Sequence, residues 1–361
     1  RILEASREGG EAYFRMESSK GEEVLQSLTS RVELSRVGDI LRLYCKALTG
    51  TNVSIHPASE LAEKGIGWVS ERLPSTEGTT VFLPEYVEDH LEKRDNFNVY
   101  KVYATHQAAH LEFGSFRYVF GRAGPVYPEV SCVAREEAMR EETAAGDGAT
   151  AALTDIERFF DLFPDRRLAL DLFTIVEDAR IDFLVRREYG GIRRSWRQMQ
   201  EAELERRPDA RMLPLRQALL ENLVRASLDG AHRIVWPRAL GHTLGEGLRL
   251  LASVQVREAT VEDSAEATLR LYDLAMRVPN VPPDQLGDLE WEALDEQMLD
   301  VLLSTPRTGA ADSELMQLPQ GEEAAYESPQ QVDFRGDFKP EMVQLLMRLR
   351  MQQQGEAPGE L

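Results

Sequence analysis

Residues 97–114, FNVYKVYATHQAAHLEFG, are the stretch that decides the fold of this chain. Apolar residues recur there at helical spacing, and Gly114 stands where a left-handed residue commonly ends a helix, so we predict a helix over residues 97–113. His106 and His110 fall on the apolar face of that helix. An i, i+4 spacing holds two imidazoles about 6 Å apart at Cβ, a separation that suits a single metal ion.

A second strong helix is predicted over residues 166–187, and it places the carboxylate of Glu177 on an apolar face. That face is otherwise formed by Leu170, Phe173, Ile181 and Leu184. A buried carboxylate is costly unless a cation or hydrogen-bond donors meet it. Antiparallel packing of the two helices would make His106, His110 and Glu177 a three-ligand zinc site with an open fourth position. The same pattern also fits a metal-free polar cluster, in which Glu177 or Asp178 accepts hydrogen bonds from the histidines.

The remaining pattern predicts an α+β fold that is predominantly helical, with a small N-terminal sheet. Short β-branched segments at 52–56 and 79–83 predict strands within an expected total of two to four. An exposed helix and loop is expected over residues 134–152. Further helices are predicted over residues 22–28, 37–48, 192–205, 213–228, 240–251, 261–277 and 289–303, and residues 342–351 are also strongly patterned.

Four parts are expected along the chain. Residues 1–80 hold N-terminal helices and the first strand, and residues 81–303 form the helical core. Residues 304–331, rich in Glu, Gln, Pro and Ser, are interpreted as a linker, followed by a segment over 332–361. The sequence opens at Arg1 within a polar, helix-like stretch, and the patterned segment 342–351 stops just before a polar tail. We therefore expect the chain to be part of a longer protein.

Composition excludes several classes of function. The 361 residues carry a formal charge of −20, which argues against a nucleic-acid binder, since such proteins need a basic face. No apolar run approaches the roughly 18 residues that cross a bilayer, so no membrane span is expected. The two cysteines, Cys45 and Cys132, cannot form a disulfide framework, which favours a reducing, cytoplasmic location.

Residues 106–110, HQAAH, resemble the HExxH signature of zincin metallopeptidases with Gln107 in the place of the glutamate. The order of a strand, an HxxxH helix and a later helix with a ligand glutamate is similar to the gluzincin arrangement. The resemblance implies a zincin-like core that binds Zn²⁺ through His106, His110 and Glu177.

Longer stretches resemble the N-terminal region of bacterial von Willebrand factor A domain proteins that work beside MoxR-type AAA+ ATPases, such as nitric-oxide-reductase activation proteins and Rubisco-activase subunits. These stretches are FLPEYV (82–87), NFNVYKVYATHQAAHLEFGSF (96–116), VEDARID (176–182) and VDFRGDFKPEMVQLLMRLR (332–350), the last leading toward an A domain outside this chain. The resemblance implies a MoxR-type ATPase and a protein target as partners. Asp178 and Asp182 would orient an imidazole N–H or pair with Arg180; alternatively, they form a solvated acidic pair.

The departures from these families bear on catalysis. In a zincin the glutamate of HExxH is the general base, and an amide such as Gln107 cannot accept that proton. Glu112 lies on the same helix but five residues further on, where it faces elsewhere and is a poor substitute. The chain has neither the DxSxS of an A-domain metal site nor the GxxxxGK[ST] of a P-loop, so it does not hydrolyse ATP by that route.

Three functions therefore compete. The favoured one is a non-catalytic interaction or adaptor module, built on a degenerate metallopeptidase-like core, that acts with a MoxR-type ATPase in remodelling or maturation of a target complex. The alternative is a zinc metallopeptidase with an atypical base. The third is a purely structural helical scaffold in which the two histidines are core residues.

One basic stretch runs against the acidic composition. Residues 180–216 contain ten arginines and six acidic residues. We favour exposed helix faces as its explanation, because arginine greatly outnumbers lysine throughout the chain. The alternative is a docking face for an acidic partner with Trp196 as its anchor.

Overall fold

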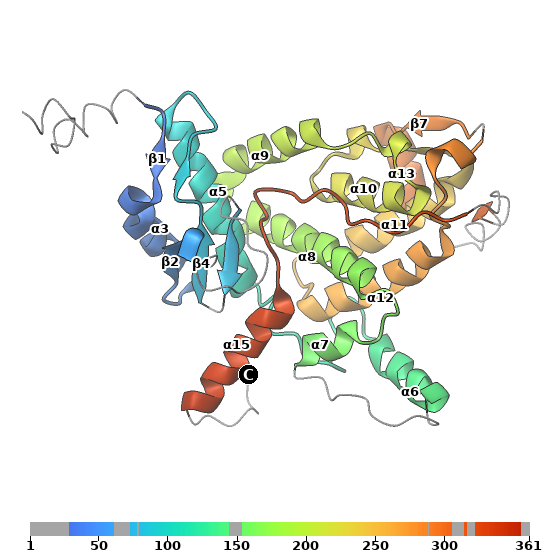
Figure 1. Ribbon diagram of the computed structural model, residues 1–361, viewed down its shortest axis with the longest axis horizontal. Helices are drawn as coiled ribbons and strands as arrows, with labels where there is room; N and C mark the ends of the chain where they lie inside the picture. Colours follow the sequence, from blue (N-terminus) through green and yellow to red (C-terminus); the bar gives the residue numbers. More distant parts are fainter. Residues whose placement is uncertain are drawn as a thin grey trace, which may run out of the picture.

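The computed structural model describes residues 29–60, 73–77, 79–143, 154–287, 289–304, 314–315 and 322–354 of the chain. Helices dominate these residues, and the short strands gather in sheets of two or three (Figure 1). The predicted α+β, predominantly helical fold with a small N-terminal sheet is confirmed. The helix predicted over residues 22–28 lies outside the described residues.

A small β layer precedes the helical core. Strand β2 pairs in parallel with β4, β3 pairs antiparallel along the other edge of β4, and β1 pairs with β5. Both predicted strands are present as β2 and β4, and the helix predicted over 37–48 is α3, which ends before Gly50 at a φ of 68°. The bounds are β1 (Val32–Glu33), α3 (Leu34–Thr49), β2 (Ser54–Pro57), β3 (Ser75–Glu77), β4 (Thr80–Leu83) and β5 (Tyr86–Val87).

Helix α5 (Lys93–Glu112) joins this β layer to the helical core, since it packs against α3 and β4 on one side and α8 on another. Its end follows the predicted pattern. Gly114 has a φ of 75°, and the Ser115 N–H donates to the His110 carbonyl over 3.0 Å. This cap holds the last turn, which carries His110, in a fixed orientation.

Helix α8 (Arg166–Glu188) is the centre of the helical core (Figure 1). The Asp165 carboxylate caps its first turn by accepting the Leu168 N–H over 3.0 Å. Helices α5, α10 and α12 all pack against it, so most of its middle turns are buried on every side. The spacing of its apolar residues predicts one buried face for α8, but the surrounding helices bury nearly all of its sides.

The other predicted helices are present within a few residues of their expected bounds. Residues 261–277 match α12, whose first turn is fixed by a reciprocal capping box between Thr260 and Asp263. These helices are α6 (Ser131–Thr143), α9 (Arg193–Arg206), α10 (Leu215–Ser227), α11 (Gly241–Ser253) and α12 (Val261–Arg277). The short helix α7 (Asp155–Phe160) was not predicted, and 3-10 turns lie at Gly190–Ile192, Ala210–Met212, Ala231–Arg233, Arg238–Leu240 and Pro283–Gln285.

Only β2 and β4 were predicted individually, and two of the other described strands lie in the C-terminal half of the chain. Strand β6 (Val235–Pro237) pairs antiparallel with β7 (Trp291–Ala293). The prediction of one helix over 289–303 is therefore wrong in its first half, and only α13 (Glu296–Ser304) is helical there. Three-residue strands carry too little alternation to be distinguished from a helical period. The seven strands of the described residues exceed the predicted two to four.

The C-terminal segment, residues 322–339, crosses the helical core before α15 (Pro340–Gln354) (Figure 1). Its Tyr326 hydroxyl donates to Asp171 of α8 over 2.7 Å, and its Ala324 N–H donates to the Asn280 carbonyl over 2.9 Å. The described part of the predicted linker thus packs against the core. Within the described residues, no helix has the length and apolar character needed to cross a membrane.

Candidate metal centre

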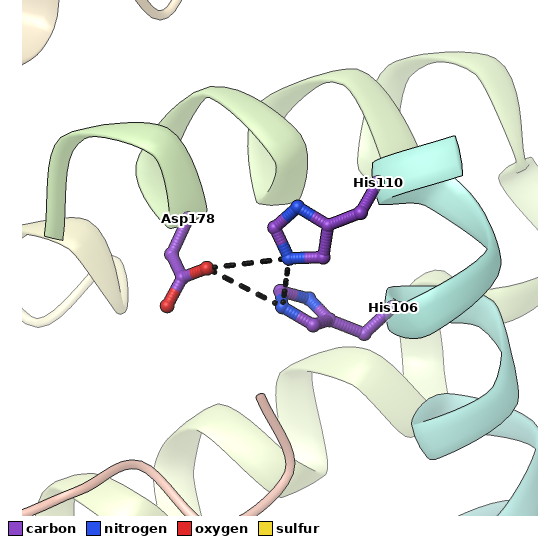
Figure 2. Close-up of side chains that lie close together, drawn as sticks. All are labelled: His106, His110 and Asp178. Atoms are coloured by element: carbon purple, nitrogen blue, oxygen red, sulfur yellow. Dashed lines mark hydrogen bonds and ion pairs between the residues drawn. The ribbon is translucent and has the colours of Figure 1, made fainter. Parts of the chain in front are cut away.

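Two imidazoles from α5 and one carboxylate from α8 meet inside the core (Figure 2). The Nε2 atoms of His106 and His110 lie 3.1 Å apart, and each lies 3.5 Å from Oδ1 of Asp178. The two rings stand edge to face, with an interplanar angle of 86°. All three side chains are almost completely buried, so these donor atoms form a small triangle screened from solvent.

The triangle has the size that a metal ion requires. A tetrahedral zinc with bonds of about 2.0–2.1 Å places its donor atoms roughly 3.3 Å apart. Asp178 Oδ1 is buried and has no hydrogen-bond partner among the described residues. An orphaned carboxylate oxygen aimed at two imidazole nitrogens is costly without a cation, because burial removes its hydration. These residues therefore fit a divalent metal ion.

The charges around the triangle favour a cation as well. Asp178 and Asp182 face one guanidinium, that of Arg335, whose Nη2 donates to Asp182 Oδ2 over 2.8 Å. With both imidazoles neutral, the cluster retains one excess negative charge in a buried place. A divalent cation would offset this charge, and the two aspartates would stay ionised to hold it.

The pKa values of the cluster follow from the same charges. Burial disfavours the charged form of His106, but the carboxylates of Asp178 and Asp182 outweigh it and raise the pKa of this imidazole. Burial, aided by the neighbouring His106, lowers the pKa of His110. Burial would raise the pKa of Asp178, yet the two histidines and Arg335 hold it well below its ordinary range. Asp178 is therefore ionised and suited to ligation.

The far nitrogen of each imidazole faces a polar group, through a hydrogen bond for His110 and at ion-pair distance for His106. Nδ1 of His106 lies 3.3 Å from Asp182 Oδ1, and Nδ1 of His110 lies 2.8 Å from the Ser115 hydroxyl. Metal-bound histidines almost always make such contacts through their second nitrogen. Asp182 thus has the orienting position that the sequence analysis considered for it. The solvated alternative for Asp178 and Asp182 is wrong, because both carboxylates are buried.

Glu177, the third ligand predicted from sequence, has a different partner. Arg180 donates to its two carboxylate oxygens over 2.9 and 2.5 Å, and the Ser264 hydroxyl donates to it over 2.7 Å. The carboxylate within reach of both Nε2 atoms belongs instead to Asp178, the next residue along α8. Arg180 therefore pairs with Glu177 rather than with either aspartate.

Gln107 links three parts of the chain. Its Oε1 accepts from the Thr76 hydroxyl of β3 over 2.5 Å, and its Nε2 donates to the Arg335 carbonyl over 2.7 Å. The second bond needs an N–H donor, which an ionised glutamate lacks. Glu112, the weak substitute base, accepts instead from the Tyr189 hydroxyl, and no contact among the described residues joins it to the triangle.

The C-terminal segment covers the triangle. Phe338 stacks on His110 with a centroid distance of 4.7 Å, and Phe334 stands edge-on to His106 at 6.0 Å. The segment approaches β3 closely at Gly336, where φ is 71° and a Cβ would lie 1.9 Å from the Pro74 carbonyl oxygen. Only glycine fits this position. Sequence reasoning gave no role at the site to residues 334–338.

A cavity of about 280 Å³ lies between α8 and this segment, and Asp178, Thr174, Arg335 and Phe338 contribute to its wall. It is the space next to the triangle through which a water or small ion could reach Asp178. Comparison with protein-family models, with curated proteins and with solved structures finds no match to this chain.

Proposed function

We propose that this chain is a non-catalytic interaction module whose core holds a zinc ion on His106, His110 and Asp178. We further propose that the chain is part of a von Willebrand factor A domain protein. In the cytoplasm it would serve as an adaptor between a MoxR-type AAA+ ATPase and a protein target. The observation that carries the non-catalytic part is the bonding of Gln107, whose amide is engaged at both ends. It leaves the zincin general-base position without a proton acceptor.

Burial of the site supports the same conclusion. The triangle is covered by Phe334 and Phe338 of the C-terminal segment, and Asp178 has only 4% of its surface exposed. Peptide hydrolysis needs a groove in which an extended backbone lies against the metal. The adjoining cavity of about 280 Å³ is at the small end even for compact organic ligands. A metal here would instead tie α5 to α8, since the energy of metal binding adds to that of folding.

The partner part of the proposal rests on the stretches at 82–87, 96–116, 176–182 and 332–350 that resemble the VWA group. The chain has no P-loop motif, so the energy for remodelling a target would come from a separate ATPase. An acidic chain with a formal charge of −20 is also suited to an interaction partner rather than to a nucleic-acid binder.

Two assays test the proposal. Metal-loaded chain is incubated with unfolded casein, and we expect no cleavage above that of the His106→Ala variant. Turnover that His106→Ala abolishes would overturn the non-catalytic assignment and favour the metallopeptidase. Separately, the full-length protein is used to capture partners from its own cells. Recovery of an AAA+ ATPase is expected, and its absence under conditions that retain known complexes would remove the adaptor assignment.

A further inference from the structure

An arginine-rich pocket lies at the C-terminal end of α8. Its cavity volume is about 370 Å³, and its wall combines the last turns of α8, the first turns of α9 and the turn after α10. The lining residues are Phe183, Arg186, Arg187, Arg193, Arg197, Gln200 and Asp229. Four guanidiniums and one carboxylate give this pocket a net positive charge in a chain whose total charge is −20.

The arginines are only partly neutralised. Arg186 pairs with Asp229, while Arg187 lies 3.6 Å from Glu188 in a long, exposed contact. Arg193 donates to the main-chain carbonyls of Arg186 and Arg187, which hold its guanidinium in place without cancelling its charge. Arg197 makes no ion pair with any residue that the structure describes. The pocket therefore presents fixed positive charge toward solvent.

Asp229 is the residue that an incoming anion would displace. Its φ of 65° makes it the only non-glycine residue in the left-handed region among the described residues. Its carboxylate is 70% exposed, while its partner Arg186 is 24% exposed. An exposed acid at a strained turn, paired with a more buried arginine, acts as an internal counter-ion that an external anion can replace.

We infer that this pocket binds a small oxyanion of the phosphate class, either inorganic phosphate or the phosphate group of a small molecule. Two helices contribute guanidiniums to the wall of this one pocket. Such groups suit the several oxygens of a phosphate, since each planar fork offers paired N–H donors. The volume is within the range of small-ligand sites. A long acidic peptide is a poorer match, because a pocket of about 370 Å³ holds one small group and Glu188 beside it would repel further carboxylates.

The pocket is separate from the metal centre. The two sites are linked through Asp182, whose main-chain carbonyl accepts from Arg186 over 3.3 Å and whose Oδ2 accepts from the pocket residue Gln200 over 3.5 Å. Neither contact involves a side chain of the His106, His110 and Asp178 triangle. The inference therefore stands whether or not a metal binds, and the Asp178→Asn variant allows it to be tested without the metal site.

The test is calorimetric titration of the full chain with inorganic phosphate and with pyrophosphate at fixed ionic strength. One site per chain is expected. Arg197→Ala should weaken binding about tenfold, the effect expected from loss of one charge-assisted contact. Arg194→Ala is the matched control, because Arg194 is on the same helix but lines a different cavity toward α5, and its affinity should equal that of the parent chain.

A gain-of-affinity variant separates binding from folding effects. Asp229→Asn removes the internal counter-ion but keeps a residue type that tolerates a left-handed φ, so binding should tighten several-fold. The same titrations in the Asp178→Asn background should give the same affinities. Absence of binding to either probe, equal losses in Arg197→Ala and Arg194→Ala, or unchanged affinity in Asp229→Asn would each overturn the inference.

Discussion

Substitution of Asp178 by asparagine tests which carboxylate binds the metal. Asp178 Oδ1 lies 3.5 Å from both Nε2 atoms and has no hydrogen-bond partner within the described residues, so its charge is available to a cation. Loss of a residue that only hydrogen-bonds a metal ligand typically weakens metal binding 10–100-fold. Removal of one of the three ligands themselves should weaken it further, by about 3 kcal/mol in binding free energy. The apo chain also loses the contacts of the ionised Asp178 with both histidines and Arg335, so the metal effect is measured as the difference that a chelator makes within each variant.

Thermal unfolding with and without a chelator measures the effect. Metal at about 100 times its dissociation constant stabilises a fold by roughly 2.7 kcal/mol. In a chain of 361 residues this raises the unfolding temperature by about 3–4 °C. The parent chain should lose this increment on chelation, and Asp178→Asn should show none. Asp171→Asn is the matched control on α8, because Asp171 accepts from Tyr326 and is not one of the three ligands. A full chelator shift in Asp178→Asn would refute the ligand assignment.

Three further variants test the surrounding contacts. Glu177→Gln should retain the metal by elemental analysis. Its free energy of unfolding in urea should fall by about 3–5 kcal/mol, because Arg180 stays buried without its counter-charge. Loss of the metal would contradict this expectation. Gln107→Glu should give no casein cleavage and a lower urea midpoint, since a carboxylate cannot donate to the carbonyl that Gln107 now reaches; gained hydrolysis would contradict it. Glu136→Gln tests an ion pair with Arg158 that lowers the pKa of Glu136. The substitution should reduce the free energy of unfolding by about 0.5 kcal/mol above pH 4.5, and this loss should fade as the pH falls through the lowered pKa. A loss that is independent of pH would argue against the pair.

Sequence reasoning located the elements of the site but not the third ligand. HxxxH fixes a shared helical face by spacing alone, so His106 and His110 could be predicted to converge. Glu177 and Asp178 are neighbours separated by about 100° around α8. Which of them is the metal ligand depends on which face of α8 packs against α5. Because α8 is buried on nearly all sides, both faces are apolar in pattern, and the arginine partner of Glu177 could not be inferred from periodicity.

The arginine-rich stretch over residues 180–216 is a second case in which the sequence did not show which side chains are buried. Trp196 is completely buried and packs against His106 and Phe334, so the alternative of a docking face anchored by Trp196 is wrong. Helical spacing placed it near arginines, but which face of α9 turns toward the core depends on the packing of α5 and α8. The covering role of residues 334–338 was also hidden, because contacts between segments some 230 residues apart carry no local signal.

The central claim is that a single metal ion sits between α5 and α8, and X-ray absorption at the metal edge of the purified chain tests it most directly. We expect one zinc per chain with two imidazole nitrogens and a carboxylate oxygen among its ligands, at distances of about 2.0–2.2 Å. A chain that binds no metal at stoichiometric loading, or a spectrum unchanged in Asp178→Asn, would contradict the claim.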